Sequence, residues 1–562
     1  MLRHLALTAF TLLILAAPAA RAAQAPGRVV LPPVLPPASS GPEETNVDAR
    51  GAGPAVALPD GGVVLAGGRS NVVLTQLRRD GAPEPSFGNG GTARPAVPGD
   101  RFSLLQLVRR PDGRLLLIGT TPASSNLESP RLAAVGLTAQ GALDPAFGQG
   151  GVARLAVQGC SWICSPAALQ PDGSLVLAGA TGQVREPKTP EQARDPNFSS
   201  DKRSVVARLT PAGALDAGFG DVGVATIPVS AGRSTGGFGV GATAEGRLLT
   251  LGAGPDGPRV TALTPTGAVD PAYNGGAPVP VPAAFALLVD PTGRVDVIGV
   301  ERLVRLTAAG TPDVTFGEAG TTTYRSTACC SPQVLPTADG GLLVASMTTR
   351  DGRVASALRV LSISPRGVRG ATTDVNLGFG GGFASPDKST RIAPGLDQDG
   401  FLPGALVQRP DGSFVLAGGV RIGRYTGEGA GFSTGLFAAA ALTPALRLDR
   451  TFGGPPAPAR FQLRVPTQRA GADARRRRIL VRVTASGPGL ALLRVRDGRR
   501  RIVAQSLEPI FAAGTGSAVQ VPLTTIGRRV LGRGRSVRVS VGYAFRDVLT
   551  SATEGARIVR LR

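Results

Sequence analysis

A phrase of about eleven residues recurs along the chain and constrains its fold more than any other feature. The clearest copy is GALDPAFGQGG at Gly141–Gly151, where an acidic residue is followed by two spacers, an aromatic residue and glycines. The acidic residues of the seven copies are Glu84, Asp144, Asp216, Asp270, Asp313, Asp374 and Asp449. The aromatic residues are Phe87, Phe147, Phe219, Tyr273, Phe316, Phe379 and Phe452. Repetition at this spacing predicts an array of equivalent structural units.

Each copy of the phrase follows a pair of short apolar runs that flank a turn. In ALQPDGSLVLAG at Ala168–Gly179, for example, the turn is Asp-Gly. Apolar runs on either side of such a turn are typical of a β-hairpin. A third run leads into the phrase and a fourth leaves it. Four short antiparallel strands in seven repeats predict a seven-bladed β-propeller over residues 55–454.

The two ends of the repeat array predict how it closes. The seventh repeat stops at Thr451–Ala459, where prolines prevent a normal fourth strand. Residues 23–54, before the first repeat, are rich in proline but include the strand-like segment Arg28–Leu31. We expect this segment to supply the missing strand and so remove an open edge.

The hairpin and the G-x-L-D-x-x-F-G-x-G-G phrase together resemble the delta-60 repeat of exported bacterial proteins, over Ala55–Gly454. The fourth copy departs from the pattern at Tyr273-Asn274, and the sixth, at Thr372–Gly382, carries two extra residues. The resemblance implies an exported or surface protein with a propeller-like fold. It implies no catalytic residue.

The phrase has a structural explanation that needs no ligand. Its acid can accept hydrogen bonds from the backbone of its own turn, its aromatic residue can pack between neighbouring repeats, and its glycines supply positive φ. A calcium site is the alternative, but each copy offers one carboxylate where calcium takes about 6–8 oxygen ligands. We therefore expect no metal site.

The first 22 residues have the pattern of a secretory signal peptide, with Arg3 and His4 before an apolar run and a small-residue cleavage site at Ala20–Ala22. No later stretch is long and apolar enough to span a bilayer, so we expect a secreted or cell-surface-associated protein. His4 is the only histidine. Without imidazole for acid–base chemistry or zinc binding, we expect neither catalytic residues nor a cofactor.

The irregular loops are expected to share one face of the propeller, because alternate turns of a four-stranded meander lie at opposite ends. We expect an unidentified protein or glycan to bind there, at Trp162, Arg421, Arg424 and Tyr425. Cys160, Cys164, Cys329 and Cys330 fall on the same face. An even number of cysteines in an exported chain favours two local disulfides. A cross-link between the loops and a thiol metal site are the alternatives.

Most of the positive charge lies at the C-terminal end. After a proline-rich linker at 455–459, residues 460–562 contain 22 arginines and 5 acids, a net of 22 − 5 = +17 out of +22. Their alternating apolar runs predict an immunoglobulin-like β-sandwich. The densest basic runs are Arg475, Arg476, Arg477, Arg478, Arg499, Arg500 and Arg501. They are candidate contacts for an anionic cell-envelope polymer, and a merely solvated face is the alternative. Few aromatics lie among them, which argues against specific nucleic-acid recognition.

These observations predict a secreted, non-enzymatic repeat protein that acts as an interaction scaffold or an envelope-associated scaffold. Two alternatives stay open. One is a carboxylate-dependent propeller enzyme of the glycosidase or lyase type, and the other is a carbohydrate-binding propeller.

Overall fold

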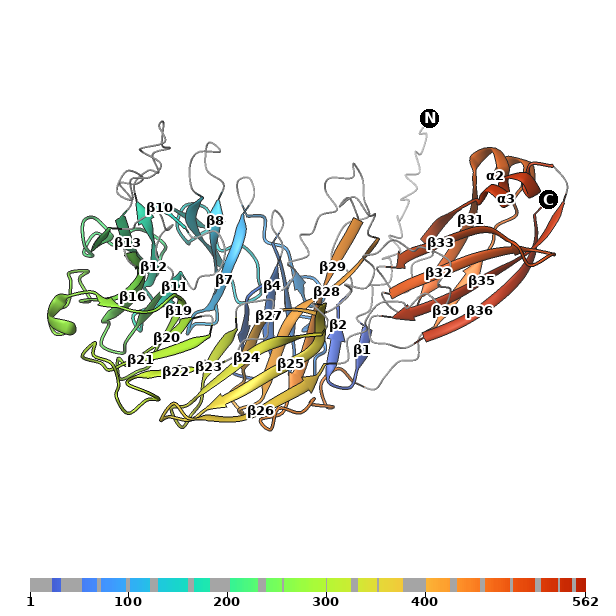
Figure 1. Ribbon diagram of the computed structural model, residues 1–562. Helices are drawn as coiled ribbons and strands as arrows, with labels where there is room; N and C mark the ends of the chain where they lie inside the picture. The colour runs from blue at the N-terminus through green and yellow to red at the C-terminus, as the bar shows by residue number, and fades with distance from the viewer. Residues whose placement is uncertain are drawn as a thin grey trace, which may run out of the picture. The chain divides into compact units, whose positions relative to one another are not determined.

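The computed structural model describes residues 23–31, 53–67, 72–97, 102–121, 130–159, 166–181, 203–230, 239–254, 257–299, 301–324, 332–350, 353–377, 401–424, 432–454, 460–485, 489–510, 517–533, 536–547 and 552–561 (Figure 1). The chain forms two compact units, one of residues 24–457 and one of residues 458–547 and 551–562. Both are built almost entirely of antiparallel strands. The prediction of an all-β protein is therefore confirmed.

Four sheets of the first unit have four strands in chain order. They are β3 (Ala55–Ala57), β4 (Val63–Gly67), β5 (Val73–Leu77) and β6 (Thr92–Ala93); β15 (Gly239–Ala242), β16 (Leu248–Gly254), β17 (Gly257–Leu263) and β18 (Val279–Pro280); β19 (Ala284–Val289), β20 (Val295–Gly299), β21 (Arg302–Leu306) and β22 (Thr321–Thr323); and β23 (Gln333–Pro336), β24 (Leu342–Arg350), β25 (Arg353–Ile363) and β26 (Arg369–Asn376). A 3-10 turn, η1 (Asn274–Gly276), precedes β18.

Two further sheets complete the described part of this unit. One has eight strands: β7 (Ser103–Arg109), β8 (Leu115–Thr121), β9 (Arg131–Leu137), β10 (Val152–Gln158), β11 (Ala167–Leu169), β12 (Leu175–Thr181), β13 (Arg203–Leu209) and β14 (Val224–Ser230). The other is ordered β1-β2-β29-β28-β27 and comprises β1 (Ala23–Ala25), β2 (Arg28–Val30), β27 (Phe401–Gln408), β28 (Phe414–Arg424) and β29 (Phe432–Leu442).

The hairpin turns follow the local chemistry of their sequences. Between β7 and β8, the carboxylate of Asp112 accepts the backbone N–H of Arg114 at 3.0 Å, and Gly113 adopts φ +87°. Asp60, Asp172 and Asp411 accept the equivalent bond in other repeats. The second strands β4, β8 and β12 are almost wholly buried, as expected for Val- and Leu-rich strands packed on both faces.

The eight-stranded sheet joins the second and third repeats, which the sequence predicts as separate four-stranded units. The link is a single register position, Gln158 of β10 opposite Ala180 of β12. Gly179 allows β12 to lie this close to β10, because a Cβ at this position would lie 2.4 Å from a Val157 methyl group and 2.5 Å from the Gln158 carbonyl oxygen.

The N-terminal segment completes the last repeat. Strand β2 pairs with β29, with Arg28, Val29 and Val30 opposite Ala440, Ala439 and Ala438. The backbone N–H of Gly27 also donates to the carbonyl of Phe452 at 2.6 Å. The prediction that Arg28–Leu31 fills this place is confirmed, and β1 adds a further edge strand.

The sixth repeat differs from its prediction. Thr372–Asn376, the start of the predicted sixth phrase, lies within strand β26, so the assignment of Asp374 to a turn is wrong. The preceding turn is Ser364–Gly367. Gly370 stands where the other phrases have their acid, so no side chain is present to cap a further turn, and the chain enters β26 directly. Phe379 lies outside the described residues.

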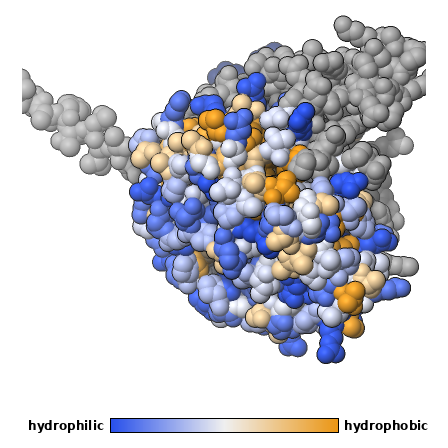
Figure 2. All heavy atoms as spheres, turned by 90° about the vertical axis from the view of Figure 1, so that its left-hand side faces the viewer, coloured by the Kyte–Doolittle hydropathy of each residue, from blue (hydrophilic) through white to orange (hydrophobic). Residues whose placement is uncertain are grey.

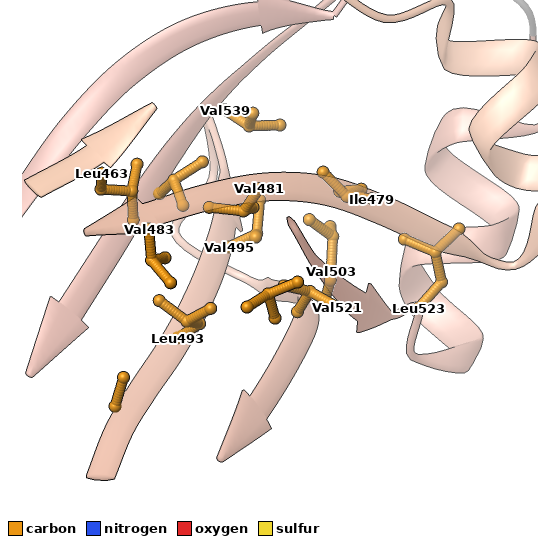
Figure 3. Packing of buried hydrophobic residues seen from close by; sticks show 14 of the residues in the cluster. Leu463, Ile479, Val481, Val483, Leu493, Val495, Val503, Val521, Leu523 and Val539 are labelled. Carbon is orange, nitrogen blue, oxygen red and sulfur yellow. The ribbon is translucent and has the colours of Figure 1, made fainter. Parts of the chain in front are cut away.

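The second unit contains two sheets, ordered β30-β31-β34 and β33-β32-β35-β36. Their strands are β30 (Phe461–Arg464), β31 (Arg478–Ala485), β32 (Gly489–Asp497), β33 (Ile502–Ile510), β34 (Ser517–Pro522), β35 (Val537–Asp547) and β36 (Ala552–Leu561). Alternate residues of both sheets share one core, in which Val481 and Val483 lie near Leu493 and Val495 (Figure 3).

Two short helices, α2 (Ala470–Arg476) and α3 (Thr525–Leu531), belong to the second unit and were not predicted. The Thr524 hydroxyl caps α3 by accepting the backbone N–H of Gly527 at 3.0 Å. Among the described residues, no helix has the length and apolar composition needed to cross a membrane.

Candidate functional site

The face predicted to bind a partner lies largely outside the described residues. Trp162, Tyr425 and the four cysteines, Cys160, Cys164, Cys329 and Cys330, all fall in that undescribed part. Arg421 and Arg424 belong to strand β28, whose backbone alone is described there. On the face of the first unit that Figure 2 shows, hydrophilic residues predominate and hydrophobic residues lie in small separate groups.

The acids of the repeated phrase are engaged in their own turns. Each of six accepts the backbone N–H two residues later, at 2.9–3.1 Å: Glu84, Asp144, Asp216, Asp270, Asp313 and Asp449. Hydrogen bonds from the hydroxyl and the N–H of Ser86 lower the pKa of Glu84. These carboxylates are therefore held as acceptors within the fold.

Arginines bind several of the same acids and join neighbouring repeats. Arg208 pairs with Asp216 at 2.7 Å, donates to the carbonyl of Pro265 in the next repeat, and lies 4.7 Å from the centre of the Phe219 ring. Arg114 pairs with Asp144 at 3.1 Å and Arg247 with Asp270 at 2.7 Å.

The fifth repeat buries its arginine completely. Arg305 has no exposed surface and binds both carboxylate oxygens of Asp296, at 2.6 and 3.0 Å. It also donates to the carbonyl of Pro365 at 2.8 Å and stacks over Phe316 at 4.1 Å. A bidentate pair with further acceptors is the geometry in which a buried arginine is tolerated.

The aromatic residue of one phrase packs against the first glycine of the next phrase along the chain. A Cβ at Gly213 would lie 2.9 Å from the Phe147 ring, and the N–H of Gly148 donates to the carbonyl of Ala212 at 2.7 Å. The same hydrogen bond is donated at five other junctions, by Gly88, Gly220, Asn274, Gly317 and Gly453. The bond from Gly453 reaches Asp80 in the first repeat and thus connects the last repeat to the first.

The acids of the repeated phrase and the arginines that bind them thus serve the architecture of the first unit. No group of three His, Cys, Asp or Glu side chains in the described ranges is arranged to hold a metal ion. In the second unit, by contrast, arginines far outnumber acids.

The structure brings the two predicted arginine runs to the same end of the second unit. The carbonyl of Arg477 accepts the N–H of Leu523 at 2.9 Å, and the next residue, Thr524, bonds to the carbonyls of Ile502 and Val503. These contacts place the start of β31 beside the start of β33, which follows Arg499–Arg501. We call the seven exposed residues Arg475, Arg476, Arg477, Arg478, Arg499, Arg500 and Arg501 the basic end.

One acid anchors the basic end. Asp497 accepts the backbone N–H groups of Arg499 and Arg501 and pairs with the Arg501 guanidinium at 2.7 Å. Burial alone would raise the pKa of Asp497, but these hydrogen bonds lower it overall. Arg478 bonds to Gln520. Within the described residues, the guanidinium groups of the other five form no salt bridge.

A pocket of about 530 Å³ opens in the same unit, lined by residues of β30, β31, β35 and β36. Its lining includes three arginines, Arg464, Arg482 and Arg557, and the neutral polar residues Gln462, Thr484 and Tyr543. Sequence reasoning missed these residues because it searched for dense runs of arginine. The alternation of exposed arginines with buried residues in β30 and β31 was the available signal.

No protein-family model and no curated protein matched this sequence. Similar solved structures include the PQQ-bound aldose sugar dehydrogenase of Streptomyces coelicolor, at 17% identity over 62% of this chain and 99% of that chain, with a TM-score of 0.32. A gluconolactonase from Xanthomonas campestris matches at 11% identity over 62% and 96%, with a TM-score of 0.27. A polysaccharide lyase matches at 10% identity over 72% and 94%, with a TM-score of 0.35.

The comparisons correct one expectation from the sequence. The similar structures are enzymes, which contradicts the prediction of a non-enzymatic scaffold, and that prediction is withdrawn. Likeness at this level assigns no reaction, substrate or cofactor to this chain.

Proposed function

We propose that the chain is an exported, seven-bladed β-propeller of delta-60 repeats followed by an immunoglobulin-like sandwich, and that the sandwich binds an anionic polymer of the cell envelope. The architecture is supported by the strand order within the sheets and by the pairing of β2 with β29. The two-sheet core of the second unit supports the sandwich.

The observation that carries the binding proposal is the convergence of both arginine runs at the basic end. Seven exposed arginines lie there, and the nearby carboxylates are those of Asp497, which pairs with Arg501, and of the buried Asp473. Uncompensated positive charge of this density attracts polyanions and releases their counterions, so binding is expected to weaken steeply with salt.

For the propeller, we propose the alternative function, an enzyme of the carboxylate-dependent glycosidase or lyase type, or a carbohydrate-binding unit. The acids of the repeated phrase accept hydrogen bonds within their own turns, and several also pair with arginines. Acids that act on a substrate would therefore come from the face with the irregular loops. Screening the full-length protein for cleavage of neutral and acidic polysaccharides tests this, and a complete absence of cleavage and of sugar binding would refute it.

The binding proposal is tested by sedimenting the full-length protein with isolated cell envelope across a salt series. One variant replaces Arg475, Arg476, Arg499 and Arg500 with Gln. A charge-matched control replaces Arg94, Arg366, Arg369 and Arg450, exposed arginines of the first unit. We expect the first variant to leave the envelope at lower salt than the wild type and the control. Release of both variants at the wild-type salt concentration would overturn the proposal.

A further inference from the structure

The pocket in the second unit places like charges across two paired strands. Arg464 of β30 lies directly opposite Arg482 of β31, and both side chains are exposed. Like charges in directly opposite positions destabilise a sheet. Within the described residues neither guanidinium forms an ion pair or a side-chain hydrogen bond, so no internal acid compensates this repulsion. An external anion bound beside the two arginines would compensate the repulsion.

A third arginine comes from the other sheet. Arg557 of β36 lies opposite Val541 of β35, which is fully buried. Residues in directly opposite positions share a face of the sheet, so Arg557 projects from the core-facing side of β36, which is an edge strand. Strand β30 is the edge of its own sheet and contacts β36. Arg464 and Arg482 lie on the solvent-facing side of their own sheet, because the alternating residues Leu463 and Val483 are buried. All three arginines line one pocket at this edge of the unit.

Neutral groups complete the pocket. Gln462 lies opposite Thr484, two positions along the same pair of strands and therefore on the same face as Arg464 and Arg482. Tyr543 lies opposite Gly555, where a Cβ would stand 2.7 Å from the Tyr543 hydroxyl. This glycine thus leaves room for the hydroxyl beside the pocket. The ring of Tyr543 rests against Phe461, with ring centroids 4.7 Å apart.

We propose that this pocket binds one acidic sugar unit, either a hexuronate or a sulfated hexose, within an anionic polysaccharide. The inference rests on the proposed binding of an anionic polymer and names its recognition subsite. Guanidinium groups match carboxylate and sulfate oxygens. The amide of Gln462 and the hydroxyls of Thr484 and Tyr543 can donate to and accept from sugar hydroxyls. A volume of about 530 Å³ lies in the range of small-ligand pockets.

The pocket is also connected to the basic end along one strand. Arg478 and Arg482 occupy the same face of β31, because they are four residues apart in a strand whose side chains alternate. At about 3.3 Å per residue their Cα atoms are about 13 Å apart. A polysaccharide chain whose unit occupies the pocket can thus extend its next charges toward the basic end.

Other polyanions fit the pocket less well. Polyphosphate has no hydroxyl groups for the three neutral side chains. Single-stranded nucleic acids bind largely by stacking bases on aromatic rings, and the one aromatic ring that lines the pocket, Tyr543, packs on Phe461.

The experiment is titration calorimetry of the full-length protein with three probes: an oligogalacturonate tetramer, its methyl ester, and a heparin tetrasaccharide. The pocket variant is Arg464→Gln with Arg482→Gln. The control is Arg538→Gln with Arg560→Gln, another cross-strand pair of exposed arginines in the same unit that does not line the pocket. We expect at least one acidic probe to bind, the pocket variant to weaken it more than tenfold, and the control to change it less than twofold.

Oligogalacturonate carries carboxylates alone, whereas heparin carries both carboxylates and sulfates. Tighter binding of oligogalacturonate would therefore identify a carboxylate site, tighter binding of heparin would show a contribution from sulfate, and the methyl ester is expected not to bind. Tyr543→Phe removes only a hydroxyl and is expected to weaken binding severalfold in a fully folded protein. Equal loss in the pocket variant and the control would overturn the subsite, because charge alone would then explain binding. Polyphosphate displacing the bound tetrasaccharide at equal charge concentration would overturn the sugar assignment.

The two proposals fail differently. If no tetrasaccharide binds while the envelope still retains the protein, the subsite is wrong and the proposed function stands. If the tetrasaccharide binds through the pocket while the envelope does not retain the protein, the subsite is confirmed and the proposed envelope function is wrong.

Discussion

Arginine serves two different purposes in the two units. In the first unit, Arg208 and Arg305 pair with Asp216 and Asp296, donate to carbonyls of the next repeat and stack on aromatic rings. In the second unit, Arg464 and Arg482 face each other across two strands without a carboxylate. The same side chain therefore joins repeats in one unit and leaves charge available to solvent in the other.

The difference follows from where the acids are. The repeated phrase brings one carboxylate to nearly every repeat, and the fold places an arginine within reach of many of them. Residues 460–562 have 5 acids for 22 arginines, so this segment has too few acids to pair with most of its arginines. An arginine that pairs with an acid inside the protein stabilises the fold. An arginine without such an acid is available to bind an external anion, and it costs some stability.

The largest expected effect comes from breaking a paired arginine of the first unit. Arg305→Ala leaves the Asp296 carboxylate buried without its partner, and we expect a loss of about 3–5 kcal/mol in unfolding free energy. Denaturant unfolding of the full-length protein measures it. Arg305→Lys keeps the charge but not the bidentate geometry and is expected to be intermediate. A loss below about 1 kcal/mol for the alanine variant would show that the pair is not structural.

The next largest effect on stability is expected from a buried acid of the second unit, Asp473. Burial raises the pKa of Asp473 to about 6, against the opposing influence of Arg476. Because the folded pKa lies above the ordinary value of an aspartate, 3.8, the folded state holds the proton more tightly, and this unit loses stability as the pH rises from about 4 to about 6.

Asp473→Asn removes this cost. We expect it to stabilise the second unit by up to about 3 kcal/mol at pH 7 and to have little effect below pH 4. Hydrogen exchange of peptides from β31 and β33, measured at both pH values, follows the unit directly. An equal effect at pH 4 and pH 7 would contradict the role of the buried carboxylate.

A pair of glycine substitutions tests how much the contacts at the junctions between repeats contribute to stability. Gly213 and Gly150 both have positive φ, but a Cβ at Gly213 meets the Phe147 ring and the Gly148 nitrogen, whereas nothing lies within 4 Å of one at Gly150. We expect Gly150→Ala to cost about 1 kcal/mol from backbone strain and Gly213→Ala about 1–3 kcal/mol more from overpacking. Thermal unfolding compares them, and equal losses would mean that the junction contact is unimportant.

The smallest effect concerns the unpaired charges themselves. Arg464→Gln with Arg482→Gln relieves a cross-strand repulsion, so we expect a gain of a few tenths of a kcal/mol in low salt. The gain should shrink in high salt because exposed charges are screened. Unfolding at two ionic strengths measures it. A loss of stability instead would indicate that these arginines form contacts within the fold.

Local patterns in the sequence predicted the parts of the fold that depend on local chemistry. The Asp-Gly hairpins and the pairing of Arg28–Val30 with the last repeat follow from apolar alternation and proline positions. The sheet that joins the second and third repeats could not be predicted in this way. It depends on the contact of Gly179 with Val157, two residues that are not neighbours in the sequence.

The sixth repeat shows how a motif search can misplace a residue. Asp374 lies in a plausible copy of the phrase, yet it pairs with Arg359 of the neighbouring strand at 2.7 Å. The seventh repeat has Leu446 with φ +57° where the other repeats have glycine. Neither the position of Asp374 within a strand nor the positive φ of Leu446 could be predicted from the residue type. The pocket was missed for a related reason: Arg464 and Arg482 become neighbours only through strand pairing, and Arg557 lines the same pocket from the other sheet.

The pairing of β2 with β29 has a consequence for the timing of folding. Arg28 and Ala440 are neighbours in the sheet but 440 − 28 = 412 residues apart along the chain. At synthesis rates of about 5–20 residues per second, roughly 20–80 seconds separate the appearance of the two strands. During that interval the early strand has no partner and the first repeat has no neighbour on one side. The pairing joins residues made early to residues made late in the first unit, so a chain interrupted before β29 leaves β2 without this partner.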